Sequence, residues 1–349
     1  MGRRVLLGMS GGIDSSVSAM ILQDQHYEVV GITFLFGGSN KTNQKITKDA
    51  KNLAEKLGIK HLTIDLRKEF RATVIKYFKE EYLAGRTPFP CAYCNPKIKF
   101  NYLQEFARKE NCNFISTGHY AQTRKYNGRK YIYKGVDTEK DQSFFLWGLS
   151  SVLIEKLIFP LGGLTKNEVR QFANARGFES LSEKKDSFGI CFIEGKDYRK
   201  FLETEGIFSK TGNFVDATGN ILGQHKGIAN YTIGQRHGLG VNLNFPVFVS
   251  EFRLDDNEIV LAKYSELYKK FIVINNYQFI DYQEIKHRKR YAMKVRYRLQ
   301  ETPCELNILD ETRVAVRLLK PEAMIAEGQT TVFYEGDRLA GGGFIESSK

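Results

Sequence analysis

The sequence lacks the features of a secreted or membrane-bound protein. No apolar run approaches the length needed to span a bilayer, and the short apolar run near the N-terminus is too brief for a signal peptide. Only five of the 349 residues are cysteines, an odd number that argues against a secreted disulfide framework. Internal repeats and low-complexity tracts are also absent. We therefore expect a cytoplasmic globular protein with reduced thiols and no membrane partner.

Acidic residues are too few to balance the basic ones. The chain has 52 Lys and Arg against 40 Asp and Glu, which gives a net charge of +12 and a pI of about 9.3. Such a balance favours a polyanionic partner, and we expect nucleic acid. With 42% hydrophobic residues, the chain can bury substantial cores in two or three domains.

A glycine-rich stretch at residues 8–16 lies between a strand-like run at 5–7 and a helix predicted over 17–25. Gly11 and Gly12 allow backbone N–H groups to converge at a helix N-terminus, where a phosphate group binds well. The stretch lacks the Lys of a Walker A loop and does not fit the dinucleotide fingerprint. An ordinary glycine-rich turn is the alternative, but the hydroxyls of Ser10, Ser15 and Ser16 favour phosphate binding.

Apolar periodicity predicts an alternation of strands and helices. Strands are expected at 28–36, 61–66 and 113–117, and helices at 45–57, 70–83 and 98–109. This α/β pattern implies a parallel sheet with the glycine turn at the carboxyl end of its first strand, where ligands bind. A hairpin turning at Asn127-Gly128 and a capping box at 165–168, which opens a helix ending near Gly177, are also expected. Short strands and frequent glycines then predict two small β-rich domains, with domain bounds at 1–200, 201–268 and 269–349.

Cys94 has the sequence setting of a reactive thiol. It precedes the predicted helix at 98–109, and Lys97 and Lys99 are close by. A helix N-terminus and nearby cations lower the pKa of a thiol, so we expect a reactive Cys94, with an inert, partly buried cysteine as the alternative.

The setting of Cys191 is less decisive. Lys184 and Lys185 precede it, and the residues alone leave its role open. Cys112 and Cys304 have no such basic setting, so we interpret both as structural.

A basic segment near the C-terminus has the pattern of a strand. Residues 286–290 are basic and lead into a run in which charged and apolar residues alternate. The alternation puts Lys294, Arg296 and Arg298 on one face of a predicted strand, as a phosphate-binding stripe. A merely solvated basic face is the alternative.

Several of these stretches resemble known enzymes. Ser10-Gly11-Gly12-Ile13-Asp14-Ser15 is similar to the signature of the PP-loop ATP pyrophosphatases, which adenylate a substrate and release pyrophosphate. Further motifs along nearly the whole chain resemble the tRNA-specific 2-thiouridylases, the MnmA family. They are Gly85-Arg86-Thr87-Pro88, Cys94-Asn95, Ile98-Lys99-Phe100, Thr117-Gly118-His119-Tyr120-Ala121, Lys140-Asp141-Gln142-Ser143, Asp186-Ser187, Gly189-Ile190-Cys191-Phe192-Ile193 and Thr232-Ile233-Gly234-Gln235-Arg236.

The resemblance implies that ATP and Mg²⁺ activate the 2-oxygen of a wobble uridine in tRNA, which sulfur then replaces. Asp14 would bind near Mg²⁺, and Phe34 stands where family members often have Met. The residues that match the family's ATP contacts are Gly8, Met9, Ser10, Gly11, Gly12, Ile13, Asp14, Ser15, Phe34 and Gly118.

The resemblance also implies roles for the cysteines. Cys191 matches the persulfide-bearing cysteine and Cys94 its partner nucleophile, and the two would form a disulfide that a reductant opens. Cys91 departs from the family, which carries Asp there, and gives a Cys-x-x-Cys pair with Cys94. Together the three cysteines could hold a [4Fe–4S] cluster, which is the alternative mechanism; a zinc site is less favoured.

The implied partners are tRNA and a sulfur-donating protein, and we expect a monomer. The target base would be flipped into a pocket lined by Phe89, Pro90 and Cys91, with Phe89 in place of the family's Asn. The other residues that match tRNA contacts are His119, Lys140, Asp141, Gln142, Arg296, Tyr297 and Gln329. A lone histidine after a strand is more often structural, which is the alternative for His119.

Two other functions remain open from the sequence. Another PP-loop enzyme, such as an amide-forming synthetase or a tRNA lysidine synthase, would share the glycine turn but would not need the two cysteines. A non-enzymatic RNA-binding protein would explain the charge but would not need ATP.

Overall fold

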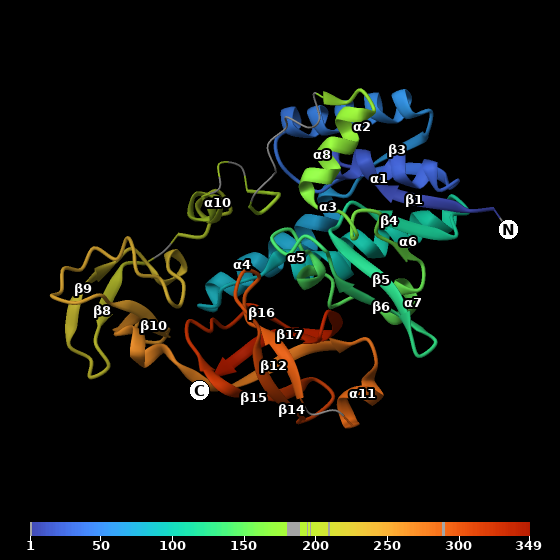
Figure 1. The fold of residues 1–349 in the computed structure, drawn as a ribbon. Coiled ribbons are helices and arrows are strands. Elements are labelled where there is room, and N and C mark those ends of the chain that lie inside the picture. The colour runs from blue at the N-terminus through green and yellow to red at the C-terminus, as the bar shows by residue number, and fades with distance from the viewer. Residues whose placement is uncertain (1, 180–188, 194, 196, 209, 288–289) are drawn as a thin grey trace. The chain divides into compact units, whose positions relative to one another are not determined.

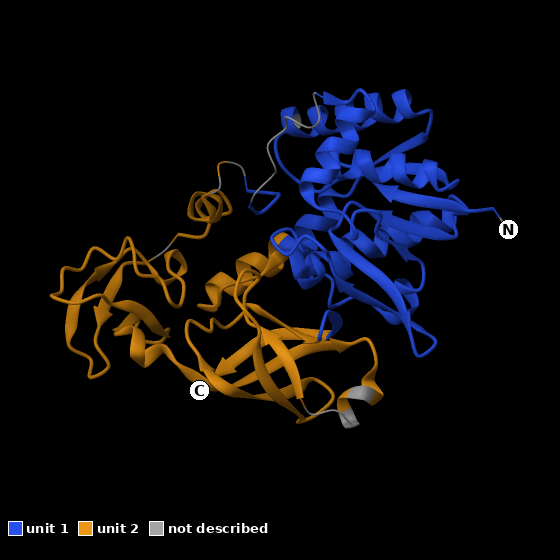
Figure 2. Cartoon of the chain, viewed as in Figure 1, with its two compact units in different colours: residues 1–74, 91–194, 336–340 blue, residues 75–90, 195–335, 341–349 orange. Residues whose placement is uncertain are grey.

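The chain divides into two compact units. The computed structural model describes residues 2–179, 189–193, 195, 197–208, 210–287 and 290–349. Unit 1 holds residues 1–74, 91–194 and 336–340, and unit 2 holds 75–90, 195–335 and 341–349 (Figure 2). None of the helices in these described ranges is both long enough and apolar enough to cross a membrane.

Unit 1 is built on a parallel five-stranded sheet with the strand order β3-β2-β1-β4-β7 (Figure 1). The central strand β1 pairs with β2 on one side and with β4 on the other, so the carboxyl ends of all three meet at one edge. The parallel α/β arrangement confirms the fold class expected from the sequence. The strands are β1 (Arg4–Gly8), β2 (Glu28–Leu35), β3 (Lys60–Asp65), β4 (Phe114–Thr117) and β7 (Leu157–Ile158).

Helices connect these strands and begin earlier than periodicity predicts. The first runs over Ile13–Asp24 instead of starting at residue 17, since the polar residues at its start are helical as well. The second runs over Asn40–Leu57 and ends at Gly58, whose φ of 64° is the left-handed cap that glycine supplies. Among the described residues, the α-helices that lie wholly within unit 1 are α1 (Ile13–Asp24), α2 (Asn40–Leu57), α3 (Arg67–Phe70), α6 (Phe100–Lys109), α7 (Ser151–Ile154) and α8 (Lys166–Ala175). The expected capping box at Thr165 and Glu168 opens α8.

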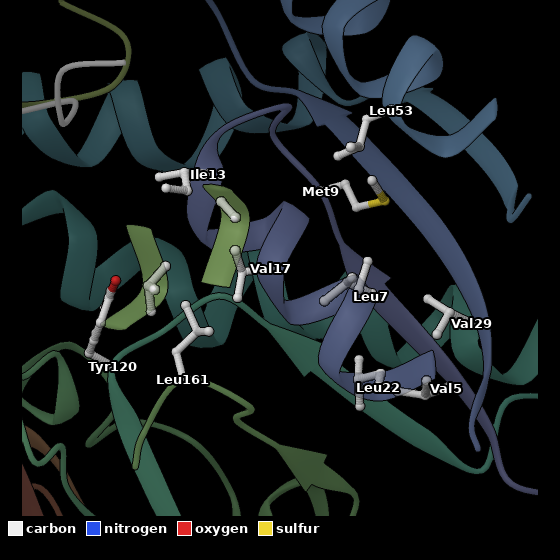
Figure 3. Packing of buried hydrophobic residues seen from close by; sticks show 13 residues of the cluster. Val5, Leu7, Met9, Ile13, Val17, Leu22, Val29, Leu53, Tyr120 and Leu161 are labelled. Atoms are coloured by element: carbon white, nitrogen blue, oxygen red, sulfur yellow. The ribbon is translucent and has the colours of Figure 1, made fainter. Parts of the chain in front are cut away.

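An apolar core fixes α1 and α8 against the sheet (Figure 3). Val5 and Leu7 of β1 are fully buried, and they pack in one cluster with Val17 of α1 and Val169 of α8. Each such side chain contributes roughly 1.5–3 kcal/mol through burial. The glycine turn between β1 and α1 is therefore held at both ends by buried side chains.

Residues 90–109 form one continuous helical run, so the helix predicted at 98–109 begins earlier and includes Cys91 and Cys94. Helix α5 (Pro90–Cys94) is followed by a π-helical turn over Asn95–Lys99 and then by α6. The Phe100 N–H donates to the Asn95 carbonyl, five residues back. Pro96 explains the wide turn, because a proline lacks an N–H and its ring clashes with the carbonyl four residues earlier. A second π-turn (Arg71–Ile75) precedes α4 (Lys76–Leu83).

The expected hairpin is confirmed. Strand β5 (Ala121–Tyr126) pairs with β6 (Arg129–Lys134), and the turn residues Asn127 and Gly128 have φ values of 48° and 77°. Positive φ at both positions is the two-residue turn that matches the strand twist. Within unit 1, the first residues of β17 (Arg338–Ser348) extend this hairpin at Arg338.

Unit 2 is rich in β-structure, as expected for the C-terminal part. Six of its strands form a sheet in the order β12-β15-β14-β13-β16-β17, and β12 also pairs with β17, which closes the sheet as a barrel. Four others form the sheet β10-β11-β8-β9. The strands are β8 (Gly212–Val215), β9 (Ile221–His225), β10 (Phe248–Arg253), β11 (Glu258–Ala262), β12 (Lys269–Phe279), β13 (Arg290–Lys294), β14 (Thr302–Ile308), β15 (Arg313–Glu322), β16 (Thr330–Glu335) and β17. The helices are α4, α10 (Tyr198–Thr204) and α11 (Tyr282–His287).

The predicted basic stripe does not form. Strand β13 ends at Lys294, and Arg296 and Arg298 lie in the following turn. The Arg296 guanidinium donates to the carbonyls of Ile233 and Met324, at 3.2 and 2.6 Å, and burial lowers its pKa. These carbonyls hold the Arg296 side chain inside the unit. The alternation of charged and apolar residues in this run therefore does not mark an exposed basic face. Arg288 and Lys289 lie outside the described residues.

Candidate nucleotide and thiol site

The glycine turn is fixed by its own hydrogen bonds. Gly11 has a φ of 70°, and a Cβ there would lie 2.8 Å from the Asp49 Cβ of α2. The Ser15 hydroxyl donates to the Gly12 carbonyl at 3.1 Å and accepts from the Ser10 N–H at 3.3 Å. The Ser16 hydroxyl donates to the same carbonyl at 2.7 Å. The serines that suggested phosphate binding therefore also brace the turn.

The residues flanking the turn are anchored to β2. The Met9 N–H donates to the Ile32 carbonyl at 2.8 Å, and the Thr33 hydroxyl donates to the Met9 carbonyl at 2.8 Å. Next on β2, the half-buried ring of Phe34 lies among the aromatic rings of Phe36, Tyr102 and Phe106. Strand β1 ends at Gly8, and helix α1 begins at Ile13. Residues 8–15 therefore run from the end of the strand, through the turn, into the first turn of the helix.

Gly118 adjoins the start of α1. It follows β4, the neighbour of β1, and a Cβ there would lie 3.0 to 3.1 Å from Asp14 and Ser15 backbone and side-chain atoms. Only glycine allows so close an approach. The structure thus places Gly118 beside the first turn of α1.

Asp14 has two partners that sequence reasoning did not assign to it. The Lys166 ammonium lies 2.7 and 3.0 Å from the two carboxylate oxygens, and the Tyr120 hydroxyl donates to Oδ1 at 2.7 Å. Lys166 was visible in the sequence only as part of the capping box. A lysine directly after an N-cap residue is ordinary in solvent, and nothing local predicts that it is 7% exposed.

Cys94 is buried, which reverses its expected chemistry. It is 8% exposed and lies inside the helical run instead of at a helix N-terminus. Burial raises the pKa of its thiol to about 11, and the Lys99 charge only partly offsets this. Burial also raises the pKa of Cys91. Both thiols are therefore protonated at neutral pH.

Cys191 interacts with the other two thiols. Its pKa is raised to about 12, first by the protein atoms around the sulfur and then by charge on Cys91 and Cys94. Although the residue as a whole is exposed, the next one, Phe192, is buried against Phe70 with ring centroids 5.5 Å apart. The three thiols thus lie within electrostatic range in unit 1. The neighbouring motif residues Lys184, Lys185, Asp186, Ser187 and Phe188 lie outside the described residues.

Lys99 is close enough to act on both His119 and Cys94 through its charge. His119 directly follows Gly118. The His119 ring is buried against Phe100, and its Nδ1 hydrogen-bonds the Thr117 hydroxyl at 2.6 Å. Burial lowers its pKa well below the usual value, so His119 is neutral. These contacts match the structural alternative for this histidine.

Asp141 and Gln142 make hydrogen bonds that fix the backbone around them. The Asp141 carboxylate is 6% exposed and accepts from the Gly135 N–H at 2.9 Å and from the Ser143 hydroxyl at 2.9 Å. Gln142 accepts from the Tyr120 N–H at 3.0 Å. Lys140 is half-buried.

In unit 2, Gln329 contacts the segment that precedes the cysteines. Its amide donates to the carbonyls of Thr87 and Pro88, at 3.1 and 3.4 Å, and the Thr87 N–H donates to the Glu327 carbonyl at 2.8 Å. Phe89 follows and is half-buried. Pro90 is buried and begins α5, while Tyr297 lies in the turn after β13.

Comparisons with known proteins agree along the whole chain. Three family models match: a "tRNA methyl transferase HUP domain" at residues 3–195, a "tRNA methyl transferase PRC-barrel domain" at 199–263 and an "Aminomethyltransferase beta-barrel domain" at 269–345. The tRNA-specific 2-thiouridylase MnmA 3 of Phocaeicola vulgatus is 42% identical, over 99% of this chain and 95% of its own. That of Cytophaga hutchinsonii is 43% identical, over 99% and 98%.

A solved 4-thiouridine synthetase–RNA complex with bound ATP matches 58% of this chain and 50% of its own, at 21% identity and a TM-score of 0.38. The family assignment comes from the full-length relatives, because their identity exceeds 40% over nearly the whole of both chains. The chain belongs to the family of the tRNA-specific 2-thiouridylases, built on a PP-loop domain.

Proposed function

We propose that this protein is a tRNA-uridine 2-sulfurtransferase, which uses ATP to replace the 2-oxygen of a wobble uridine by sulfur. Its family membership over the full chain supports this reaction. The observation that carries the proposal is that charge on Cys94 acts on the Cys191 thiol within the unit that also holds the glycine turn. A PP-loop enzyme that made an amide would need neither thiol.

The glycine turn would hold the triphosphate of ATP. Its backbone N–H groups and the N-terminus of α1 suit an anion, and Asp14 would face the Mg²⁺ that accompanies ATP. Phe34 and Gly118 would lie on the adenine side. Adenylation turns the uridine 2-oxygen, a poor leaving group, into part of AMP and releases pyrophosphate.

Sulfur would then arrive through the two cysteines. The terminal sulfur of a Cys191 persulfide attacks C2 of the uridine, and AMP departs with the oxygen. Cys94 next attacks the Cys191 sulfur, which releases the thiolated base and leaves a Cys94–Cys191 disulfide; alternatively, Cys94 attacks the persulfide first and frees sulfide. A cellular reductant reopens the disulfide, and a sulfur-donating protein reloads Cys191.

The cluster alternative fits the described residues less well. Among them, no set of three His, Cys, Asp or Glu side chains is gathered as metal ligands. The three thiols share one region but are not arranged around a common centre, so no step here runs through a [4Fe–4S] cluster.

The net charge of +12 supports tRNA as the substrate. Phe89, Pro90 and Cys91 are proposed to line the pocket for the flipped base, in a protein that acts as a monomer. For Arg296, Asp141, His119 and Gln329, a tRNA contact requires that their present protein partners be exchanged. Lys140, Gln142 and Tyr297 complete the proposed tRNA contacts.

The reaction is tested by mass spectrometry of tRNA nucleosides after incubation with ATP, Mg²⁺ and a sulfur source. We expect 2-thiouridine with the wild type and none with Cys94→Ser or Cys191→Ser, while both variants still bind tRNA. The Cys91→Ser variant should stay active and contain no iron. The cluster mechanism instead requires that this variant lose its activity. Cys304→Ser, in the fully buried part of β14, serves as the matched control. A fully active Cys191→Ser enzyme would refute the thiol assignment.

A further inference from the structure

A partly buried ion pair joins Asp14, in the first turn of α1, to Lys166 of α8. The Lys166 side chain is 9% exposed, and its Nζ lies 2.7 and 3.0 Å from the two oxygens of Asp14. The Tyr120 hydroxyl donates to the same carboxylate, and the ammonium lies 5.7 Å from the centre of the Tyr120 ring. This pair is two residues from Gly12, at the end of α1 where an anion would bind.

The backbone of Lys166 is anchored independently of the contacts that its ammonium makes. Its N–H donates to Asp137 at 2.9 Å, and the Thr165–Glu168 capping box holds the preceding residue. The side chain beyond this anchor has four rotatable bonds. A change of partner at Nζ therefore needs no movement of α8.

A purely structural pair is a poor explanation for this arrangement. Removing a lysine from water costs several kcal/mol, and well-packed apolar residues usually stabilise a protein at least as well as a buried pair. The two partners are also unequally exposed, because the Asp14 side chain is 36% exposed and that of Lys166 only 9%. A metal ion can thus approach the carboxylate from the solvent side while the lysine contacts it from within.

Two cations compete for one carboxylate when Mg²⁺ arrives. Mg²⁺ prefers carboxylate and phosphate oxygens, so Asp14 offers it a ligand beside the nucleotide turn. Repulsion between Mg²⁺ and the ammonium then favours a new partner for Lys166. The triphosphate, with its four negative charges, is the partner that arrives with the metal.

We propose that Lys166 is a phosphate-positioning residue of the ATP site, held by Asp14 until the Mg²⁺ that accompanies ATP takes over the carboxylate. The ammonium then turns to the triphosphate, and no covalent bond is made or broken in the exchange. The inference rests on the proposed function, because it needs MgATP as the substrate.

The test measures ATP binding by calorimetry at a series of Mg²⁺ concentrations, without tRNA or sulfur. Lys166→Met should weaken MgATP binding by about tenfold, the effect of one charge-assisted hydrogen bond. It should also lower the Mg²⁺ concentration needed for half-maximal binding, since no ammonium competes for Asp14. Lys166→Arg should raise that concentration, because a guanidinium holds a carboxylate with two hydrogen bonds.

The Mg²⁺ concentration needed for half-maximal binding should thus shift in opposite directions in the two variants. If Lys166 had only a structural role, each variant would bind MgATP more weakly and would also need more Mg²⁺. Lys130→Met is the matched control, since this partly buried lysine donates to the Leu157 carbonyl at 2.7 Å and should leave both quantities unchanged. Unaltered MgATP affinity in Lys166→Met, or no rise in Mg²⁺ requirement in Lys166→Arg, overturns the inference. If Lys166→Met does not fold, the arginine variant decides alone. A wild type that does not bind MgATP would refute the proposed function instead.

Discussion

The glycine turn and the thiol segment of unit 1 are built in opposite ways. At the turn, hydrogen bonds from Ser10, Ser15 and Ser16 fix the backbone in a shape that already suits an anion. Burial raises the pKa of the Cys94 thiol to about 11, and the protein atoms around the sulfur of the otherwise exposed Cys191 raise its thiol pKa to about 12, so both groups are protonated at neutral pH. The turn therefore depends on hydrogen bonds that set its backbone conformation, whereas the state of the thiols depends on their removal from water.

The first prediction breaks the turn and has the largest expected effect. Gly11→Ala puts a Cβ 2.8 Å from the Asp49 Cβ at a φ of 70°, so the backbone must shift and MgATP binding should be lost. Gly58→Ala is the matched control, because its φ is 64° but nothing lies within 4 Å of the added atom. It should cost about 1 kcal/mol of stability through backbone strain alone and leave MgATP binding intact. Calorimetry and thermal melts measure the two effects, and equal losses of binding would contradict this account.

The second prediction concerns the pH dependence of the buried thiol. Since burial raises the Cys94 pKa to about 11, its alkylation by iodoacetamide should increase about tenfold per pH unit from pH 7 to 9 without a plateau. The folded state binds this proton more tightly than the unfolded state, so the associated stability is present below about pH 9 and is lost as the pH rises through about 11. Peptide mass spectrometry gives the rate at Cys94, with urea-unfolded protein as the control. A plateau by pH 8 would show an activated thiolate instead.

The smallest expected effect concerns the start of the thiol segment. Gln329→Ala removes the donor to the Thr87 and Pro88 carbonyls, which should cost about 0.5–1.5 kcal/mol and speed hydrogen exchange at the Thr87 N–H. Gln278→Ala is the control, as its amide donates to the neighbouring Phe279 carbonyl in the barrel. MgATP binding should not change in either variant. Unaltered exchange at Thr87 would mean that Gln329 does not hold this segment.

The sequence predicted those elements that depend on neighbouring residues or on a regular apolar period. The parallel sheet, the Asn127-Gly128 hairpin and the Thr165 capping box all appear as expected. The three-domain division stays a prediction, alongside the two compact units that the structure has.

Burial and distant partners could not be predicted from the sequence. The basic setting of Cys94 suggested a lowered pKa, but desolvation outweighs the lysine charge. Arg296 was expected on an exposed stripe, and two carbonyls far along the chain hold it inward. The Lys166–Asp14 pair joins residues that are 152 positions apart. In each case the outcome depends on burial or on a partner far along the chain, which the spacing of neighbouring residues does not reveal.

The wide turn at Asn95–Lys99 has a geometric consequence for Cys94. Each residue of an α-helix advances the side-chain direction by about 100°, and a π-turn accommodates an additional residue. Shifting that surplus along the helix would rotate Cys94 about the helix axis while Phe100 and the rest of α6 stayed in place. A shift of this turn would therefore change the direction of the Cys94 side chain while the helical run stayed intact.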